Sequence, residues 1–365
     1  MREYLLTLLV AATVSYLAVG VVRSVALRLG ILAEIRDRDV HDVPIPRLGG
    51  VGMLFGLLAG FAVAAKLPLL HRIFASGDEI RGVLTGAAVI CAVGVVDDVW
   101  GLDAVTKLAG QVLAAGLMAL QGVQLLWLPL PQRTVSLDST SGTLITVLVV
   151  LVTVNAVNFV DGLDGLAAGV VAIAAGAFFL FSYILAVQHN ADHAATPLLI
   201  SAVLVGMCAG FLVHNFNPAH IFMGDSGSML IGLLLASSTI TLTGRVSYGA
   251  LSGLDWSATL LPLLLPLAVL AVPFADLLLA VLRRTRAGRS PFAPDKQHLH
   301  HRLLEIGHSQ RRAVLIMYGW TALIAYGAVG LAVLPADVAL GLMAAGRVVL
   351  VLLVGWPRLR PRALA

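Results

Sequence analysis

Two adjacent carboxylates, Asp97 and Asp98, directly follow an apolar run in this 365-residue chain. Adjacent carboxylates at the edge of an apolar segment are costly unless they bind a cation or take part in phosphate chemistry. We therefore favour a functional role for both residues. Asp103 and Lys107 come shortly afterwards, and their spacing also fits a solvent-exposed pair of opposite charge, one turn apart on a helix.

A second group places an amide or an acid at every third position, namely at Asn155, Asn158, Asp161 and Asp164. A regular helix would rotate such a row by about 60° at each step. The glycine that follows each aspartate would loosen the helix end and let several of these oxygens converge. Carboxylate and amide oxygens in such a set suit a hard cation such as Mg²⁺.

A third group runs from Asn215 to Ser228 and contains Phe222 and the sequence Gly-Asp-Ser-Gly-Ser, which opens another apolar segment. Small residues at a helix N-terminus expose N–H groups to an anion, and Asp225 would hold a metal beside that anion. The alternative is that Asp225 or Ser226 acts only as the helix N-cap.

A fourth group consists of His298, His300, His301 and Arg302. Three histidines within four positions suggest zinc, but no cysteine is near them, and the carboxylates elsewhere suit magnesium better. Arginine and histidine together suit phosphate. A basic patch that contacts anionic lipid is the alternative.

The composition is that of a membrane protein. Hydrophobic residues make up 59% of the chain and charged residues 12%, about half the ~25% of an ordinary soluble domain. The mean hydropathy is +0.94. These values exclude a soluble globular enzyme, a disordered chain and a fibrous protein, and the long apolar runs exclude an outer-membrane barrel. The net charge of +4 indicates basic loops of a membrane protein, not nucleic-acid binding.

The apolar runs predict an all-α, polytopic membrane protein with about eleven transmembrane helices. The predicted spans lie near residues 4–22, 48–65, 82–96, 106–126, 143–157, 166–187, 197–213, 228–243, 258–282, 313–334 and 338–356. The two cysteines, Cys91 and Cys208, both fall inside apolar runs, so we expect neither a disulfide nor a cysteine-based metal site.

The distribution of basic residues predicts an external N-terminus and a cytosolic C-terminus. In that orientation 17 of the 24 lysines and arginines are cytosolic and 6 are external, while Arg347 lies inside the last span. We expect one catalytic domain, residues 1–365, since the longest hydrophilic stretch has about 30 residues. Its active site would be formed by cytosolic loops 23–47, 97–106, 155–165, 214–228 and 283–312.

Acids for a hard metal and basic groups for phosphate, gathered at one membrane face, indicate phosphoryl transfer at that face. One substrate would be water-soluble and the other a lipid.

The sequence also resembles a known family at five stretches, which occur in the family's order between Pro44 and Leu303. They read PIPRLGG, VVDDVWGLDAVTKLAGQ, NAVNFVDGLDGLAAG, FNPAHIFMGDSGSMLIG and SPFAPDKQHLHHRL.

The family is that of the polyprenyl-phosphate N-acetylhexosamine-1-phosphate transferases (glycosyltransferase 4 family). Within it, the sequence is more similar to the N-acetylglucosamine branch than to the phospho-N-acetylmuramoyl-pentapeptide transferases. The run around His298 departs from the Met-Ala-Pro-Ile-His-His-His type of the muramoyl branch, and Asp276 and about eleven spans fit the other branch. The abundance of Ala, Val, Leu and Arg indicates a bacterium with a GC-rich genome, for which the resemblance implies decaprenyl phosphate as readily as undecaprenyl phosphate.

The resemblance implies transfer of N-acetylglucosamine-1-phosphate from UDP-N-acetylglucosamine to polyprenyl phosphate, with release of UMP. This would be the first membrane step of a cell-envelope glycan such as lipopolysaccharide, teichoic acid or arabinogalactan. The resemblance also implies Mg²⁺ as cofactor, with Mn²⁺ as a substitute, a location in the bacterial inner membrane and a homodimer. A direct transfer and a route through a covalent aspartyl intermediate both remain open.

The resemblance further implies roles for individual residues. Asp225 would bind the metal with help from Asp164 or Asp161, and Asp97 and Asp98 would orient or deprotonate the lipid phosphate. The substrate-binding residues would be Lys107, Asn155, Asn158, Asn215, Phe222, His298, His300, His301 and Arg302, with Asn215 and Phe222 at the nucleoside and the last four clamping the phosphates or the sugar.

Three other functions compete with this interpretation. Another member of the same family, such as a phospho-N-acetylmuramoyl-pentapeptide transferase, would use a different UDP-sugar. A secondary transporter would place its ionisable residues near the middle of the bilayer on broken helices, whereas here the acids lie at span ends. A non-catalytic assembly factor would not need four intact clusters.

Overall fold

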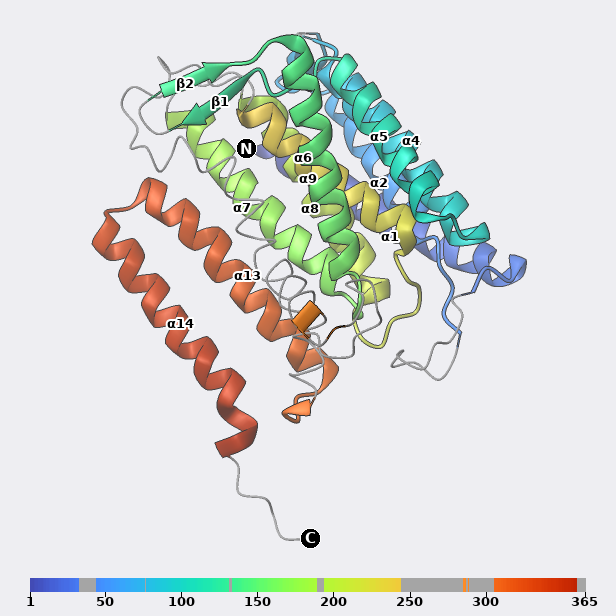
Figure 1. The fold of residues 1–365 in the computed structure, drawn as a ribbon, viewed down its shortest axis with the longest axis vertical. Coiled ribbons are helices and arrows are strands. Elements are labelled where there is room, and N and C mark those ends of the chain that lie inside the picture. The colour runs from blue at the N-terminus through green and yellow to red at the C-terminus, as the bar shows by residue number, and fades with distance from the viewer. Residues whose placement is uncertain are drawn as a thin grey trace.

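A computed structural model describes residues 1–32, 44–75, 77–130, 133–188, 194–243, 285–286, 288 and 305–359 (Figure 1). The described chain is a bundle of long helices with one short hairpin. The helices are α1 (Arg2–Leu29), α2 (Gly49–Ala64), α3 (His71–Ala75), α4 (Glu79–Trp100), α5 (Ala104–Leu120), α6 (Ser139–Val160), α7 (Leu166–Gln188), α8 (Ala195–Asn215), α9 (Gly224–Thr243), α13 (Gln310–Val333) and α14 (Ala336–Leu359).

The helical fold confirms the prediction of a polytopic membrane protein. Eight described helices are long and apolar enough to cross a membrane, and the shorter apolar helices α2 and α5 coincide with two further predicted spans. The predicted span 258–282 lies outside the described residues, so the total of eleven stays a prediction. The described chain differs from an all-α protein at the hairpin of β1 (Trp127–Leu130) and β2 (Arg133–Ser136), where Trp127 pairs with Ser136 and Leu130 with Arg133.

Helix α9 forms the centre of the bundle. It is packed against α2, α4, α6, α7 and α8, and all of its most apolar stretch is buried. A helix that is apolar on every side is stable only when other helices surround it. The residues at the start of α9 therefore lie where several neighbouring helices begin or end.

The helix ends gather at two opposite faces, as the predicted alternation of spans requires. At one face the carboxylate of Glu3, near the start of α1, accepts hydrogen bonds from the backbone N–H groups of Leu69 and Leu70 at 3.0 and 3.1 Å. At the other face lie the end of α4, the start of α5, the end of α6 and the start of α9. Figure 1 shows the N-terminus near the hairpin end of the bundle.

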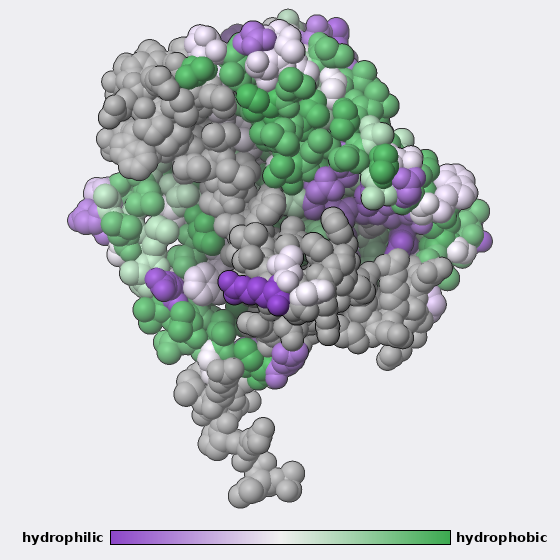
Figure 2. All heavy atoms as spheres, viewed as in Figure 1, coloured by the Kyte–Doolittle hydropathy of each residue, from purple (hydrophilic) through white to green (hydrophobic). Residues whose placement is uncertain are grey.

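The outer surface of the bundle is apolar. Leu144 and Leu148 on α6, for example, are 66% and 59% exposed, as expected for side chains that face lipid. Figure 2 shows hydrophobic residues over the described helices in its upper part, and hydrophilic residues gathered beside a hollow below them. The polar groups described next belong to this hydrophilic end of the bundle.

Candidate active site

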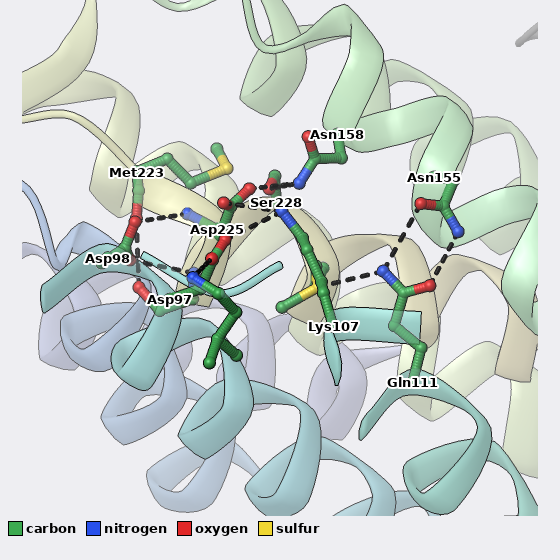
Figure 3. A network of polar contacts seen from close by, with 12 residues as sticks. Asp97, Asp98, Lys107, Gln111, Asn155, Asn158, Met223, Asp225 and Ser228 are labelled. Atoms are coloured by element: carbon green, nitrogen blue, oxygen red, sulfur yellow. Dashed lines mark hydrogen bonds and ion pairs between the residues drawn. The ribbon is translucent and has the colours of Figure 1, made fainter. Parts of the chain in front are cut away.

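An ammonium group held by two carboxylates forms the middle of the site (Figure 3). The Nζ atom of Lys107 lies 2.9 Å from Oδ2 of Asp97 and 2.7 Å from Oδ2 of Asp225. The three residues come from the end of α4, the start of α5 and the start of α9. The side chain of Asp97 is 9% exposed and that of Asp225 is 28% exposed, so this cluster is shielded from solvent but open on one side.

The predicted pairing of Lys107 with Asp103 is wrong. Asp103 is the N-cap of α5, and its carboxylate accepts hydrogen bonds from the backbone N–H groups of Val105 and Thr106 at 3.0 and 3.1 Å. An N-cap carboxylate satisfies N–H groups that have no partner within the helix. Lys107 is thus free to turn toward Asp97, whose other oxygen accepts from the N–H of Leu102 at 2.7 Å.

The carboxylate of Asp98 holds the first turn of α9. It accepts hydrogen bonds from the backbone N–H groups of Asp225 and Ser226 at 2.8 and 3.1 Å. The anion at this helix N-terminus is therefore a carboxylate of α4, whereas the sequence suggested an external phosphate. Gly224 precedes this turn with φ at +71°, and a Cβ atom there would lie 2.3 Å from Oδ2 of Asp98. Asp98 thereby fixes where Asp225 stands.

Two further glycines let α2 and α4 approach the backbone of α9. A Cβ atom on Gly50 would lie 2.1 Å from the backbone nitrogen of Gly227, and one on Gly94 would lie 2.3 Å from Cα of Ser226. Next to this contact, the backbone N–H of Gly50 donates to the carbonyl of Met223 at 3.0 Å. The Pro44–Gly50 stretch therefore packs against the segment that leads into Asp225 and is hydrogen-bonded to it.

Phe222, predicted to contact the nucleoside, lies in this segment before Asp225. Its backbone N–H donates to the carbonyl of Pro46 at 2.8 Å, and its carbonyl accepts from Gly49 at 3.0 Å. The ring of Phe222 is half-buried.

The amide of Asn158 joins α6 to Asp225. Its Nδ2 donates to Oδ1 of Asp225 and, at 3.2 Å, to Oγ of Ser228. Helix α6 ends at Val160, as the glycines beyond it predict, and Asp161 follows directly. Burial, together with the charges of Asp225, Asp98 and Asp164, raises the pKa of Asp161 to about 7, and the charge of Arg47 partly opposes this rise. The carboxylates in this part of the site therefore carry more negative charge than the neighbouring basic groups neutralise.

Asn155 is bound by a residue for which no role was predicted. Its Nδ2 donates to Oε1 of Gln111 at 2.7 Å, and Nε2 of Gln111 donates back to Oδ1 of Asn155 at 3.4 Å (Figure 3). Gln111 is buried and also contacts Sδ of Met229 at 3.3 Å. The pair ties α5 to α6 one turn from Lys107 and Asn158. In the sequence, only the spacing of Lys107 and Gln111, one helical turn apart, indicates that Gln111 lies on the same face of α5 as Lys107.

We predict an energetic coupling of about 1 kcal/mol between Gln111 and Asn155. The measurement is a double-mutant cycle of Gln111→Leu and Asn155→Leu, with the free energy of unfolding determined in detergent. In a second cycle, Gln111→Leu is combined with Leu17→Ala on the lipid-exposed side of α1, and these effects should add within about 0.5 kcal/mol. Equal coupling in the two cycles would contradict a specific bond between the amides.

Asp164 is not bonded to Lys107 or Asp225 and contacts a different set of groups. Its buried Oδ2 accepts hydrogen bonds from Nδ2 of Asn217 and from the backbone N–H of Ala219, both at 3.0 Å. Asn217 also donates to Oε1 of Gln310 at 2.7 Å, and its carbonyl accepts from Nε of Arg311 at 2.8 Å. These contacts tie the loop after α8 to the loop after α6 and to the start of α13. The geometry assigns Asp164 an organising role.

Asn215 is likewise engaged by the protein itself. Its Oδ1 accepts from the N–H of Gly165 and its Nδ2 donates to the carbonyl of Ile221, both at 2.9 Å. The hydroxyl of Tyr318 donates to the carbonyl of Gly165. The remaining predicted residues of the phosphate clamp, His298, His300, His301 and Arg302, lie outside the described residues.

The described residues fit a hard cation by their chemistry. Asp97, Asp98, Asp161 and Asp225 supply carboxylate oxygens, the ligands that Mg²⁺ prefers, and their negative charge exceeds the neighbouring positive charge. Among the residues that the structure describes, no three acids, histidines or cysteines already stand at ligand distances from a common point. Lys107 lies between Asp97 and Asp225, where it supplies the positive charge.

Comparisons with known proteins find relatives that align with most of this chain. The family described as glycosyl transferase family 4 matches residues 80–243, which run from the start of α4 to the end of α9. The decaprenyl-phosphate N-acetylglucosaminephosphotransferase of Mycobacterium tuberculosis is 49% identical over 332 residues, which cover 90% of this chain and 82% of that protein.

Two further relatives extend the comparison. The protein of the same name from Mycolicibacterium smegmatis is 46% identical over 332 residues, with 90% of this chain and 82% of the relative covered. The phospho-N-acetylmuramoyl-pentapeptide-transferase of Desulforudis audaxviator is 32% identical over 361 residues, with 90% of this chain and 98% of the relative covered. Relatives named for two different sugar groups therefore align with most of the chain.

Proposed function

The chain belongs to glycosyl transferase family 4, and from this premise we propose that it transfers N-acetylglucosamine-1-phosphate from UDP-N-acetylglucosamine to a polyprenyl phosphate. The products are polyprenyl-diphospho-N-acetylglucosamine and UMP. The names of the relatives that are 46–49% identical favour decaprenyl phosphate as the lipid. The observation that carries the proposal is the cluster of Asp97, Lys107 and Asp225 at one end of a membrane bundle in a chain so similar to those relatives.

The transfer needs positioning and charge neutralisation more than it needs a base. A phosphate monoester has a second pKa near 6, so the lipid phosphate is mostly dianionic at neutral pH. One of its oxygens attacks the phosphorus that carries the sugar, and the bond from that phosphorus to the UMP oxygen breaks. Asp97 is engaged by Leu102 and Lys107, which suits an orienting role better than proton removal.

The residues around Asp225 would hold Mg²⁺ or Mn²⁺. Asp225 is the proposed ligand, with Asp161 close by. When bound, the cation would neutralise the pyrophosphate and the charge that develops on the departing UMP oxygen. Lys107 would contact phosphate oxygens of the substrates, which are good acceptors for an ammonium group.

Radiolabel transfer into extracted lipid tests the proposal. Purified protein in detergent, decaprenyl phosphate and UDP-[¹⁴C]N-acetylglucosamine should yield labelled lipid and an equal amount of UMP. Chelation of divalent cations with EDTA should abolish the transfer, and added Mg²⁺ or Mn²⁺ should restore it. Undecaprenyl phosphate and UDP-N-acetylmuramoyl-pentapeptide are tested in parallel. A lipid product formed only from the muramoyl donor would assign the chain to the muramoyl branch. With the protein reconstituted in vesicles, uptake of labelled UDP-sugar without a lipid product would indicate a transporter.

We further propose that the site faces the cytosol of a bacterium across its inner membrane. Two positions report on this orientation, since Ser139 begins α6 and Ser309 precedes α13, at opposite faces, and both side chains are exposed. The native thiols of Cys91 and Cys208 are buried and should stay unlabelled. We predict that Ser139→Cys reacts with an impermeant thiol reagent in intact cells and Ser309→Cys only after lysis. The reverse pattern would place the site outside.

A further inference from the structure

An arginine in the middle of a lipid-facing helix has no place in the site described above. Arg347 lies in α14, eleven residues after Ala336 and eight before Gly355, the limits of the span. At 1.5 Å per residue, the nearer limit is about 12 Å away along the helix axis. The hydrocarbon core is about 30 Å thick, so Arg347 stands near its middle. The three-methylene stem of arginine is too short to carry the guanidinium to the interface from there.

The packing of α14 leaves Arg347 exposed, beside the contact with α13. One stripe of the helix contacts α13: a Cβ on Gly327 would meet Met343, and a Cβ on Gly346 would meet Leu323. Arg347 is the residue directly after Gly346, at the edge of this contact, and its side chain is exposed. Only 11% of the most apolar stretch of α14 is buried, the smallest fraction among the eight described spans. Most of the helix surface is therefore available to another molecule.

The described part of the chain gives Arg347 no counter-ion. The acidic residue in the sequences of α13 and α14 is Asp337, in the first turn of α14 and about 15 Å from Arg347 along the axis. The described ion pairs of this chain lie at helix ends, and Arg347 is in none of them. A guanidinium in hydrocarbon is costly without a partner, and charged residues in spans usually face another protein segment.

We propose that the outward face of α14 binds a transmembrane helix of another membrane protein, one that carries a carboxylate at mid-bilayer depth beside Arg347. Charge complementarity selects this occupant, because a carboxylate is the group that neutralises and hydrogen-bonds a guanidinium in hydrocarbon. The apolar residues Leu340 and Val351, two turns and one turn away, would contact the helix on either side of the ion pair. A second copy of this chain fits less well, since its described spans offer no carboxylate at that depth and an α14–α14 contact would bring two arginines together.

The test uses model helices as the probe. The full-length protein, with a donor fluorophore at its C-terminus, is reconstituted in phosphatidylcholine vesicles with acceptor-labelled Leu/Ala peptides of about 21 residues that carry Asp, Asn or Leu at the centre. We expect the Asp peptide to associate about tenfold more tightly than the Leu peptide, judged by energy transfer. Arg347→Leu should reduce its binding to the level of the Leu peptide, whereas Arg347→Lys should retain most of it.

Control variants separate the proposal from its competitors. Leu144→Val, on the lipid-exposed side of α6 and away from the proposed surface, should bind the Asp peptide like the unmodified protein, and the thermal midpoints of all variants should be equal. Equal binding of the three peptides would overturn the proposal and would indicate that water and lipid phosphate solvate the guanidinium of Arg347. Energy transfer between two labelled copies of the protein that is lost in Arg347→Leu would also overturn it, in favour of self-association.

Discussion

Asp225→Asn is expected to lower the rate of sugar-phosphate transfer by about 10³-fold, a loss of roughly 4 kcal/mol of transition-state stabilisation. The substitution keeps the size of the side chain and removes its charge. Asp225 binds Lys107 through Oδ2 at 2.7 Å and receives Asn158 on Oδ1, so it is the carboxylate on which α5, α6 and α9 meet. An amide at this position would lose the ion pair and would be a poor ligand for a divalent cation.

Asp103→Asn is the matched control, because it makes the same chemical change on a neighbouring loop. Asn and Asp are similarly good helix N-caps, so α5 should start where it does now and transfer should stay within about twofold of normal. The rates are measured as labelled lipid formed at saturating substrate and cation. A near-normal rate in Asp225→Asn would remove Asp225 from the metal role and from the centre of the site.

The sequence was sufficient to predict the long apolar helices of the described chain and the ends at which the polar groups lie. A run of about 20 apolar residues has few alternatives to a spanning helix. Because successive spans alternate in direction, the acids at 97–98, the 155–164 row and the start of α9 had to fall at one face. The start of α9 at Gly224 and the end of α6 at Val160 also agree with the prediction.

The partners of the individual side chains could not be predicted in the same way. Lys107 binds Asp97 and Asp225 instead of Asp103, and Asp98 accepts a hydrogen bond from the N–H of Asp225, 127 residues later in the chain. Such contacts depend on how each helix is rotated and how closely two backbones approach. A single sequence carries little of that information, although small residues in a helix are a general signal of close approach.

Gly94 is the position where this close approach should matter most for activity. We predict that Gly94→Ala lowers the transfer rate about 100-fold or more and costs about 1–3 kcal/mol of stability. The added Cβ would lie 2.3 Å from Cα of Ser226, and backbone atoms cannot move aside as the end of a side chain can. Helix α9 would have to shift at its first turn. Asp225 would then move relative to Lys107, which stands on α5 and does not follow that shift.

Gly116→Ala supplies the comparison, since Gly116 lies inside α5 and a Cβ atom there would meet nothing within 4 Å. Alanine favours a helix over glycine by about 1 kcal/mol, so this variant should be as stable as the unmodified protein or more so, with a normal rate. Transfer rates and thermal midpoints are measured for both variants in the same detergent. If Gly94→Ala were merely destabilised, lowering the assay temperature well below its midpoint would restore a normal rate. A rate that stays low there would show that the contact between α4 and α9 sets the geometry of the site, whereas a normal rate would show that Asp225 tolerates a displaced helix.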